Sequence, residues 1–178
     1  RLESVDYGIA TAQRTNAGLA TTVAILGYAG KPFTTKINGI MKTIYGWQDL
    51  AARKYPELGW RLLANCDVPD LGLFPARYPE LKTIRFRAGL EVPLLHLGLW
   101  AMSWLVRMKL VRSLRSLASA LYKAAPLFDV FGTNRSAFHV EMRGIGKDNK
   151  EKTVTFYILT GSGHGPNIPC IPSIILTQ

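Results

Sequence analysis

The chain has 178 residues, of which 48% are apolar and 19% are charged, and its formal net charge is +10 at pH 7. This length and composition are those of a globular chain with one sizeable core, so we predict a single domain over residues 1–178. The positive charge favours anionic partners, but it is spread along the chain and no nucleic-acid-binding motif accompanies it. Nucleic acid is therefore not expected as a partner.

The two cysteines, Cys66 and Cys170, are too few for a disulfide framework and favour a reducing compartment, which predicts a cytoplasmic location. Neither a CxxC pair nor an HExxH run is present, so we expect no metal site. The sequence shows no signal peptide. It begins at Arg1 within a predicted strand and ends within an apolar segment, which indicates a piece of a longer protein.

The first third of the chain predicts a strand, a helix and a hairpin. Alternation places Val5 and Tyr7 on one face of the strand and Asp6 on the other. A helix over residues 17–29 is rich in small residues, which indicates tight packing on a sheet or a contact with a ligand or a second subunit. The Asn38-Gly39 pair predicts a hairpin turn.

The middle of the chain has a weaker pattern. Residues 46–63 show no regular alternation, although their aromatic side chains suit packing anchors. Residues 66–79 contain three prolines and predict a loop-rich passage without a long helix. Residues 81–87 predict a strand in which Ile84 faces away from Arg85 and Arg87.

Two helices are predicted next. The first, over Val92–Val106, has Pro93 in its first turn and no charged residue, but it is shorter than the ~20 residues that cross a bilayer. It suits a buried helix, and the alternatives are a dimer interface and a membrane surface. His96 within it is interpreted as a core histidine with its hydrogen bonds satisfied. The second helix is expected over residues 113–125.

The last strong elements are two strands, over residues 136–144 and 153–160, that predict an antiparallel hairpin. In the first of them Phe138 and Val140 are expected inward, and His139 outward. If the strands pack helices on one side only, a polar, net positive sheet face results, which either binds a carboxylate or phosphate, mates with another chain, or is simply solvated. Its predicted members are Arg85, Arg87, His139, Glu141, Arg143 and Tyr157.

The segment GSGHGP, residues 161–166, forms a predicted bend after the last strand. Glycine-rich bends present backbone N–H groups to anions, and His164 within it either donates to a substrate oxygen, moves a proton, or caps nearby carbonyl groups. The spacing differs from the dinucleotide fingerprint G-x-G-x-x-G. No Ser/His/Asp or Cys/His arrangement is evident, so a hydrolase is not supported.

Several blocks together resemble the saccharopine dehydrogenase-like oxidoreductase family, in the region that follows its Rossmann domain. The resemblance covers almost the whole chain, and the blocks occur in the order of the family. They are VDYGIATAQRTNAGLATTVAILGYAGKPF, YGWQDL, CDVPDLGLFPARYP, TIRFRAGLEVPLLHLGLWAMSWLVR and GSGHGPNIPCIPSIILTQ.

The resemblance implies an α+β fold with a mostly antiparallel sheet covered by helices, the substrate and dimerisation domain of a two-domain dehydrogenase. An N-terminal Rossmann domain, absent from this chain, would bind NAD or NADP and would be its main partner, together with a second copy in a homodimer and a small-molecule substrate. The implied chemistry is hydride transfer by the nicotinamide at a carbon–nitrogen bond or a related carbon. The fragment alone is expected to be inactive.

The catalytic residues are not identified by this resemblance. The predicted substrate-binding residues rest on polar loop positions and on the expected cleft: Arg14, Trp47, Arg77, Tyr78, His164 and Asn167. The alternative function is a non-enzymatic module that binds a protein or a membrane surface through the basic segment Arg107–Arg115 beside the apolar helix.

Overall fold

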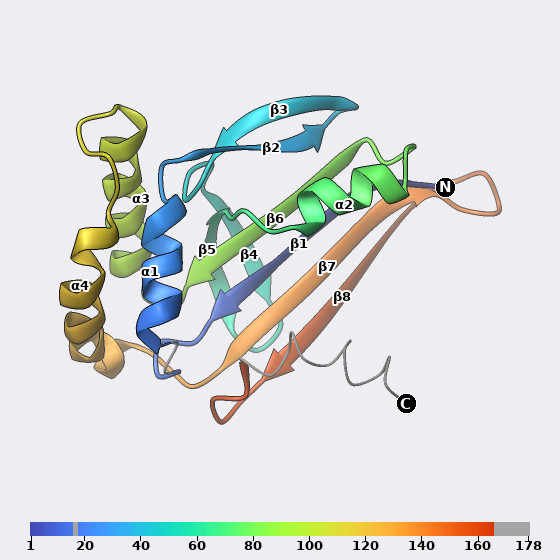
Figure 1. Ribbon diagram of the computed structural model, residues 1–178. Coiled ribbons are helices and arrows are strands. Elements are labelled where there is room, and N and C mark those ends of the chain that lie inside the picture. The colour runs from blue at the N-terminus through green and yellow to red at the C-terminus, as the bar shows by residue number, and fades with distance from the viewer. Residues whose placement is uncertain (16–17, 166–178) are drawn as a thin grey trace, which may run out of the picture.

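The computed structural model describes residues 1–15 and 18–165. Its centre is a six-stranded sheet in the order β4-β5-β6-β1-β7-β8 (Figure 1). A separate two-stranded hairpin, β2–β3, lies over it. The strands are β1 Leu2–Thr11, β2 Pro32–Ile37, β3 Ile40–Tyr45, β4 Ala51–Tyr55, β5 Gly59–Asn65, β6 Thr83–Leu90, β7 Ser136–Ile145 and β8 Glu151–Thr160.

The sheet is mixed, because β1 pairs in parallel with β6 and antiparallel with β7. The pairs β4–β5, β5–β6 and β7–β8 are antiparallel. The predicted class, α+β, is confirmed. The parallel pair was not predicted; it arises because the chain leaves β1 and returns to pair with it only after four intervening strands and two helices.

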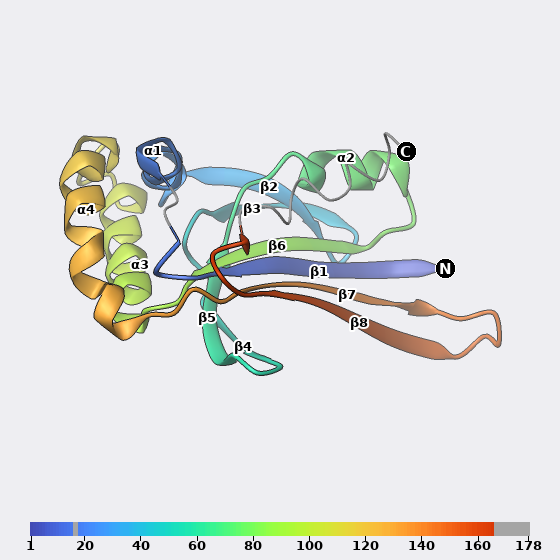
Figure 2. The same cartoon turned by 90° about the horizontal axis from the view of Figure 1, so that it is seen from below.

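The helices are unevenly distributed around the sheet. Figure 2 shows α1, α3 and α4 together at one end of the sheet, whereas α2 and the hairpin β2–β3 lie over one of its faces. The expected arrangement, a sheet covered by helices, therefore holds only in part. The helices are α1 Gly18–Tyr28, α2 Asp70–Arg77, α3 Pro93–Arg107 and α4 Ala118–Ala124, with short 3₁₀ helices η1 Arg115–Leu117 and η2 Ala125–Phe131.

The predicted hairpin turn at Asn38-Gly39 is confirmed, with positive φ at both residues. The hairpin covers the part of β6 that β5 leaves unpaired. Thr35 Oγ1 donates to the Ile84 carbonyl at 2.7 Å, and Gly39 N–H donates to the Lys82 carbonyl at 2.8 Å. Covering an exposed strand edge in this way satisfies its backbone and prevents edge-to-edge association.

Three local predictions need correction. Residues 46–63 contain the hairpin β4–β5, and residues 66–79, which contain no long helix as predicted, hold the 8-residue helix α2 in spite of Pro75 within it. This helix is short, and the fully buried side chain of Leu71 anchors it to the sheet. The helix predicted over residues 113–125 is instead the 3₁₀ helix η1 followed by the short α4.

The apolar residues form three clusters. One lies under α2 and includes Val5, Tyr7 and Ile84, as the alternation predicted. The second joins α1, α3 and α4 around Trp47, which is 1% exposed. The third is small, lies on the opposite face of the sheet from α2, and consists of Ala10, Tyr55, Leu63 and Ala137.

His96 in α3 is buried, and its ring packs edge-on against Trp47 with centroids 5.4 Å apart. Its Nδ1 accepts a hydrogen bond from the Leu90 N–H at 3.2 Å. His96 is thus a core histidine as interpreted, but its hydrogen bonds are only partly satisfied, because its Nε2 is buried without a hydrogen bond to any described residue. Burial lowers the pKa of His96 to about 4, because the imidazolium would lose its hydration.

We expect His96 to make the protein less stable in acid. Because the pKa of His96 is lower in the folded state than in the unfolded state, the unfolded chain binds the proton first, and stability is lost as the pH falls from about 6.5 towards 4. Between pH 7 and pH 4 the stability advantage of the unsubstituted protein over His96→Gln should shrink by roughly 3 kcal/mol. Urea unfolding of both proteins at several pH values measures this, and a difference that is independent of pH would contradict it.

Candidate functional site

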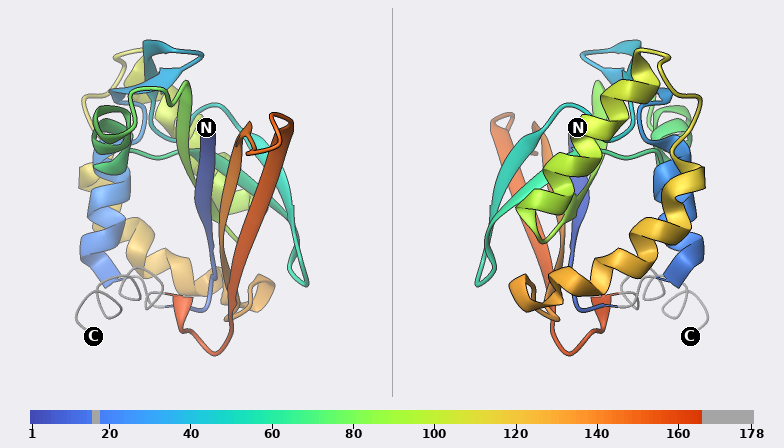
Figure 3. Two further views of the ribbon diagram at one scale, coloured as in Figure 1. Left: turned by 90° about the vertical axis from the view of Figure 1, so that its right-hand side faces the viewer. Right: turned by 90° about the vertical axis from the view of Figure 1, so that its left-hand side faces the viewer.

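The face of the sheet that α2 does not cover is polar and concave. The sheet curls so strongly that β4, at one edge, contacts β7, which lies four strands away in the sheet order (Figure 3, left). Arg53 Nη2 of β4 lies 2.9 Å from Glu141 Oε2 of β7, and the Tyr55 hydroxyl lies 2.7 Å from His139 Nδ1. We call this surface the concave face.

The cross-strand register sorts this face into rows. The third apolar cluster forms its floor, and the next row places His139 and Arg87 on either side of Gly8. The following row aligns Asp6 with Arg85 and Glu141. Along β7 the side chains become more exposed from row to row, from 0% at His139 and 14% at Glu141 to 65% at Arg143. The face therefore runs from a closed floor to an open mouth.

Two buried side chains, Tyr55 and His139, and the partly buried Asp6 form a polar chain at the closed end. Tyr55 contacts one ring nitrogen of His139, and Asp6 Oδ1 lies 3.6 Å from the other, Nε2. Burial lowers the pKa of His139, and although Asp6 raises it, the lowering prevails. Burial raises the pKa of Tyr55, so the phenol stays protonated. The tautomer that carries its proton on Nε2 accepts from the Tyr55 hydroxyl at Nδ1 and points its N–H at the Asp6 carboxylate.

Asp6 remains ionised in this position. Burial raises its pKa, but His139 and Arg87 more than offset this effect, and the net shift is downward. Arg87 Nη1 lies 2.5 Å from Asp6 Oδ2. Three polar atoms of this group, Asp6 Oδ1, Arg87 Nε and His139 Nε2, are buried without a hydrogen bond to any described residue. Buried polar atoms of this kind usually gain a partner from water or a ligand.

Arginine–carboxylate pairs occupy the middle of the face. Asp49, in the β3–β4 connection, lies 2.5 Å from Arg85 and 3.8 Å from Arg87. Glu141 accepts from both Arg53 and Arg143. Four arginines thus face three carboxylates, with neutral His139 below them. This surplus of positive charge is smaller than the sequence predicted, because Asp6 and Asp49 belong to the same surface.

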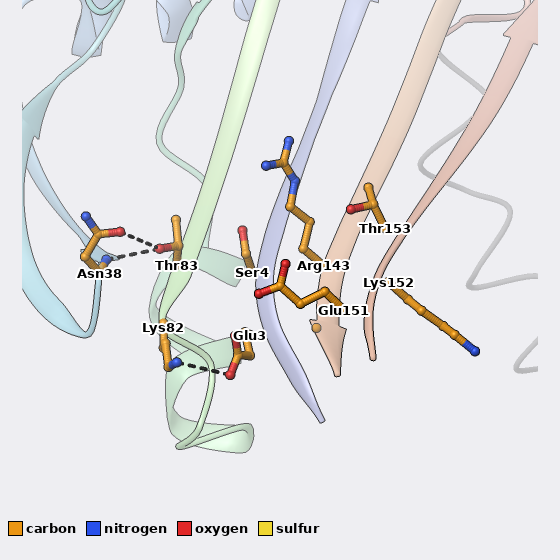
Figure 4. Close-up of a pocket in the computed structure, with 10 residues that line it drawn as sticks. Glu3, Ser4, Asn38, Lys82, Thr83, Arg143, Glu151, Lys152 and Thr153 are labelled. Carbon is orange, nitrogen blue, oxygen red and sulfur yellow. Dashed lines mark hydrogen bonds and ion pairs between the residues drawn. The ribbon is translucent and has the colours of Figure 1, made fainter. Parts of the chain in front are cut away.

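A hollow of about 410 Å³ lies at the mouth of the concave face. Figure 4 shows Ser4, Thr83, Arg143 and Thr153 side by side across β6, β1, β7 and β8. Asn38, from the β2–β3 turn, borders the hollow and donates its backbone N–H to Thr83 Oγ1 at 3.0 Å. The hollow continues the polar face outward, so a small polar molecule bound there would be within one strand row of Arg85 and Glu141.

The polar sheet face was therefore predicted largely correctly. Its six predicted members lie together, but His139 is fully buried and not outward, because the curl of the sheet places Tyr55 over it. Sequence reasoning missed Asp6, Asp49, Arg53 and Tyr55. Alternation on β1 already put Asp6 on the polar side, whereas no local signal could have indicated the other three.

The five predicted substrate-binding residues that the structure describes do not lie on the concave face. Arg77 is the last residue of α2 and not in a loop as expected, whereas Tyr78, the C-cap, lies just after the helix. Both are exposed. Trp47 is enclosed in the cluster around α1 and α3. Asn167 is outside the described residues.

Arg14 and His164 both lie near the segment that precedes β7. Arg14 donates its backbone N–H to the Thr133 carbonyl and its Nε–H to the Asp129 carbonyl. His164 is exposed and follows a turn in which Gly163 N–H donates to the Asn134 carbonyl. The fold thus brings these two predicted residues to one end of the sheet, away from Arg77 and Tyr78.

Within residues 1–15 and 18–165 no three metal-binding side chains gather closely enough to hold an ion. In the same part of the chain, no helix combines the length and the apolar character needed to cross a membrane. Comparison of the sequence with protein-family models and with curated proteins gave no match. The resemblance to saccharopine dehydrogenase-like oxidoreductases therefore stays a prediction.

Proposed function

We propose that this chain is the substrate-binding and dimerisation region of an NAD(P)-dependent oxidoreductase, and that the concave face holds an anionic group of the substrate. The observation that supports this most is the gathering of four arginines around a face that opens into a hollow. The oxidoreductase class itself rests on the sequence resemblance. In this proposal a separate N-terminal Rossmann domain holds NAD or NADP, and no residue of the present chain is assigned to the cofactor.

Arginine suits this role because its planar guanidinium binds a carboxylate or phosphate through two parallel hydrogen bonds. The side chain of Arg85 is 25% exposed and that of its partner Asp49 is 54% exposed. Breaking this ion pair to bind a ligand should therefore cost little free energy. Arg87 is held by Asp6 and keeps its buried Nε–H free for another acceptor. A substrate carboxylate would take the place of Asp49 beside Arg85, the more exposed of these two pairs.

The polar chain of Tyr55, His139 and Asp6 would position the arginines and not react with the substrate. Its histidine is 0% exposed, and its carboxylate fixes Arg87. The nicotinamide would supply the hydride, so the present residues need only bind and orient the acceptor. The cytoplasmic location and the homodimer belong to the same proposal.

The test is calorimetric titration of the chain, and of its reading frame extended upstream. NADPH and NADH should bind only the extended form. Succinate, a simple dicarboxylate probe, should bind both forms, and Arg85→Ala with Arg87→Ala should weaken that binding at least about tenfold while NADPH binding to the extended form persists. Arg135→Ala is the matched control, because Arg135 forms an exposed pair with Glu57 far from the arginine cluster in the strand register.

Each arm of the experiment addresses one part of the proposal. Unchanged succinate binding in the double variant would remove the concave face as the anion site. Failure of the extended form to bind either nucleotide would remove the oxidoreductase class and leave only an anion-binding surface.

A further inference from the structure

Helix α3 carries an unpartnered apolar face. Its buried side includes His96, Leu99, Ser103 and Val106, which pack on the sheet and on α1 and α4. The opposite side is exposed over the whole length of the helix and continues into the loop that follows. Its large members are Leu94 (67% exposed), Leu97 (42%), Trp104 (37%), Leu105 (41%), Met108 (59%) and Leu110 (66%).

Exposed apolar residues also occur in η2, at the same end of the molecule as α3. Figure 3 (right) shows α3, α4 and η2 together at the end of the molecule, in front of the sheet. In η2, Leu127, Val130 and Phe131 are 76%, 72% and 73% exposed. Single exposed apolar residues are ordinary, but a run of this length marks an interaction surface. We call this end of the molecule the helical end.

Most charges of the helical end are positive: α3 and α4 contain no acidic residue, and η2 contains one, Asp129, which accepts a hydrogen bond from Gln13. From Val92 to Phe128 the sequence contains no Asp or Glu. Lys109 and Arg112 form no ion pair with any described carboxylate, and both are exposed. The basic residues of this segment are Arg107, Lys109, Arg112, Arg115 and Lys123.

We propose that the helical end binds an anionic lipid surface, with α3 lying parallel to the membrane and its exposed apolar side at the level of the headgroups. An interfacial helix needs an apolar face, aromatic residues at its edge and basic residues beside them, and α3 with its following loop has all three. Trp104 lies next to Arg107, whose guanidinium is 4.7 Å from the Trp104 ring centroid. This binding is independent of the proposed oxidoreductase activity.

The basic residues of the helical end distinguish between two partners, an anionic membrane and a second copy of the chain. Two copies that meet through α3 and the loop after it would bring Lys109 and Arg112 of one beside basic residues of the other, and residues 92–128 contain no carboxylate to compensate them. A surface of anionic lipids attracts the same residues, each by an amount that corresponds to about a fivefold gain in partitioning. The structure therefore favours the lipid surface.

The experiment is flotation of the chain with vesicles of phosphatidylcholine that contain about 30 mol% phosphatidylserine, compared with pure phosphatidylcholine. Binding should require the anionic lipid and should weaken steeply as the salt is raised from about 0.05 M to about 0.5 M, since the Debye length then falls. Equal binding to both kinds of vesicle, or no binding to either, would overturn the proposal.

A charge variant tests the basic residues. Lys109→Glu with Arg112→Glu should lower partitioning by at least about 30-fold. Lys147→Glu with Lys150→Glu changes the net charge by the same amount in the exposed β7–β8 turn, at the opposite end of the sheet, and should bind nearly as the unsubstituted chain does. Equal losses in the two variants would show a response to net charge alone and would overturn the proposal.

An apolar variant tests the exposed side of α3. Leu94→Glu with Met108→Glu should abolish flotation, whereas Ile40→Glu with Met41→Glu, at equally exposed apolar positions of the β2–β3 hairpin, should not. Sedimentation equilibrium of the same proteins tests the alternative, a dimer formed through α3. A dimer that only the α3 variant converts to a monomer, without vesicle binding, would identify a subunit interface and overturn the lipid proposal.

Discussion

Replacing Glu91 by alanine is expected to lower the free energy of unfolding by about 4 kcal/mol. Glu91 follows β6, and its side chain is 6% exposed. Its Oε2 accepts the backbone N–H groups of Gln13 and Thr133 at 2.9 and 2.7 Å, and its Oε1 accepts the Thr133 hydroxyl and Arg61 Nη2. One carboxylate thus joins the ends of β1, β5, β6 and β7, and its loss leaves two N–H groups and a guanidinium without their acceptor.

Urea unfolding followed by tryptophan fluorescence measures this effect. Glu57→Ala is the matched control, because Glu57 pairs with Arg135 at the surface, with side chains 66% and 43% exposed, and its loss should change stability by less than about 1 kcal/mol. If Glu91→Ala were no more destabilising than Glu57→Ala, the carboxylate would not be the link that its contacts indicate.

The effect of Glu91 should disappear in acid. Burial raises the pKa of Glu91, but the backbone N–H groups of Gln13 and Thr133 outweigh it and hold the pKa below its ordinary value of 4.5. A carboxyl group with a depressed folded pKa stabilises the protein above the unfolded pKa, and this contribution is lost as the pH falls through the folded pKa. The difference in stability between the unsubstituted protein and Glu91→Ala should therefore shrink as the pH falls below 4.5 and through the depressed pKa of Glu91.

Replacing Gly30 by alanine should destabilise the protein by about 3 kcal/mol, for a reason of backbone geometry. Gly30 has φ of 71° between α1 and β2, where α3 crosses it. A methyl group there would overlap the Ser103 carbonyl oxygen and lie 2.8 Å from Val106 Cβ. Because both contacts are with α3, the helix would have to move away from the cluster around Trp47.

Gly39→Ala separates the backbone strain of a positive φ from the steric overlap with α3. Gly39 also has a positive φ, 81°, but no atom lies within 4 Å of the position that its methyl group would take. Its substitution should cost only the backbone strain, about 1 kcal/mol. Thermal and urea unfolding of both variants give the comparison, and equal losses would mean that the close approach of α3 contributes nothing.

The apolar side chains of the edge strand β8 are exposed, unlike those of the core strands. On β8 the alternation was read correctly, yet Val154 and Phe156 are 55% and 56% exposed. Alternation assigns side chains to two faces of a strand, but it does not say which face another element covers. In this protein α2 and the β2–β3 hairpin cover the sheet over β1 and β6 (Figure 2).

The sequence by itself determined the strands β1, β6, β7 and β8, the Asn38-Gly39 turn, the helix α3 and the polar side of the sheet. These features depend on local periods and on turn chemistry, which a short window of residues contains. Only the tertiary structure decided that β4 folds back onto β7, that Tyr55 buries His139, and that Arg53 and Asp49 join the concave face. Those contacts join residues about 30 to 90 positions apart through the curl of the sheet, and side-chain alternation carries no information about curl.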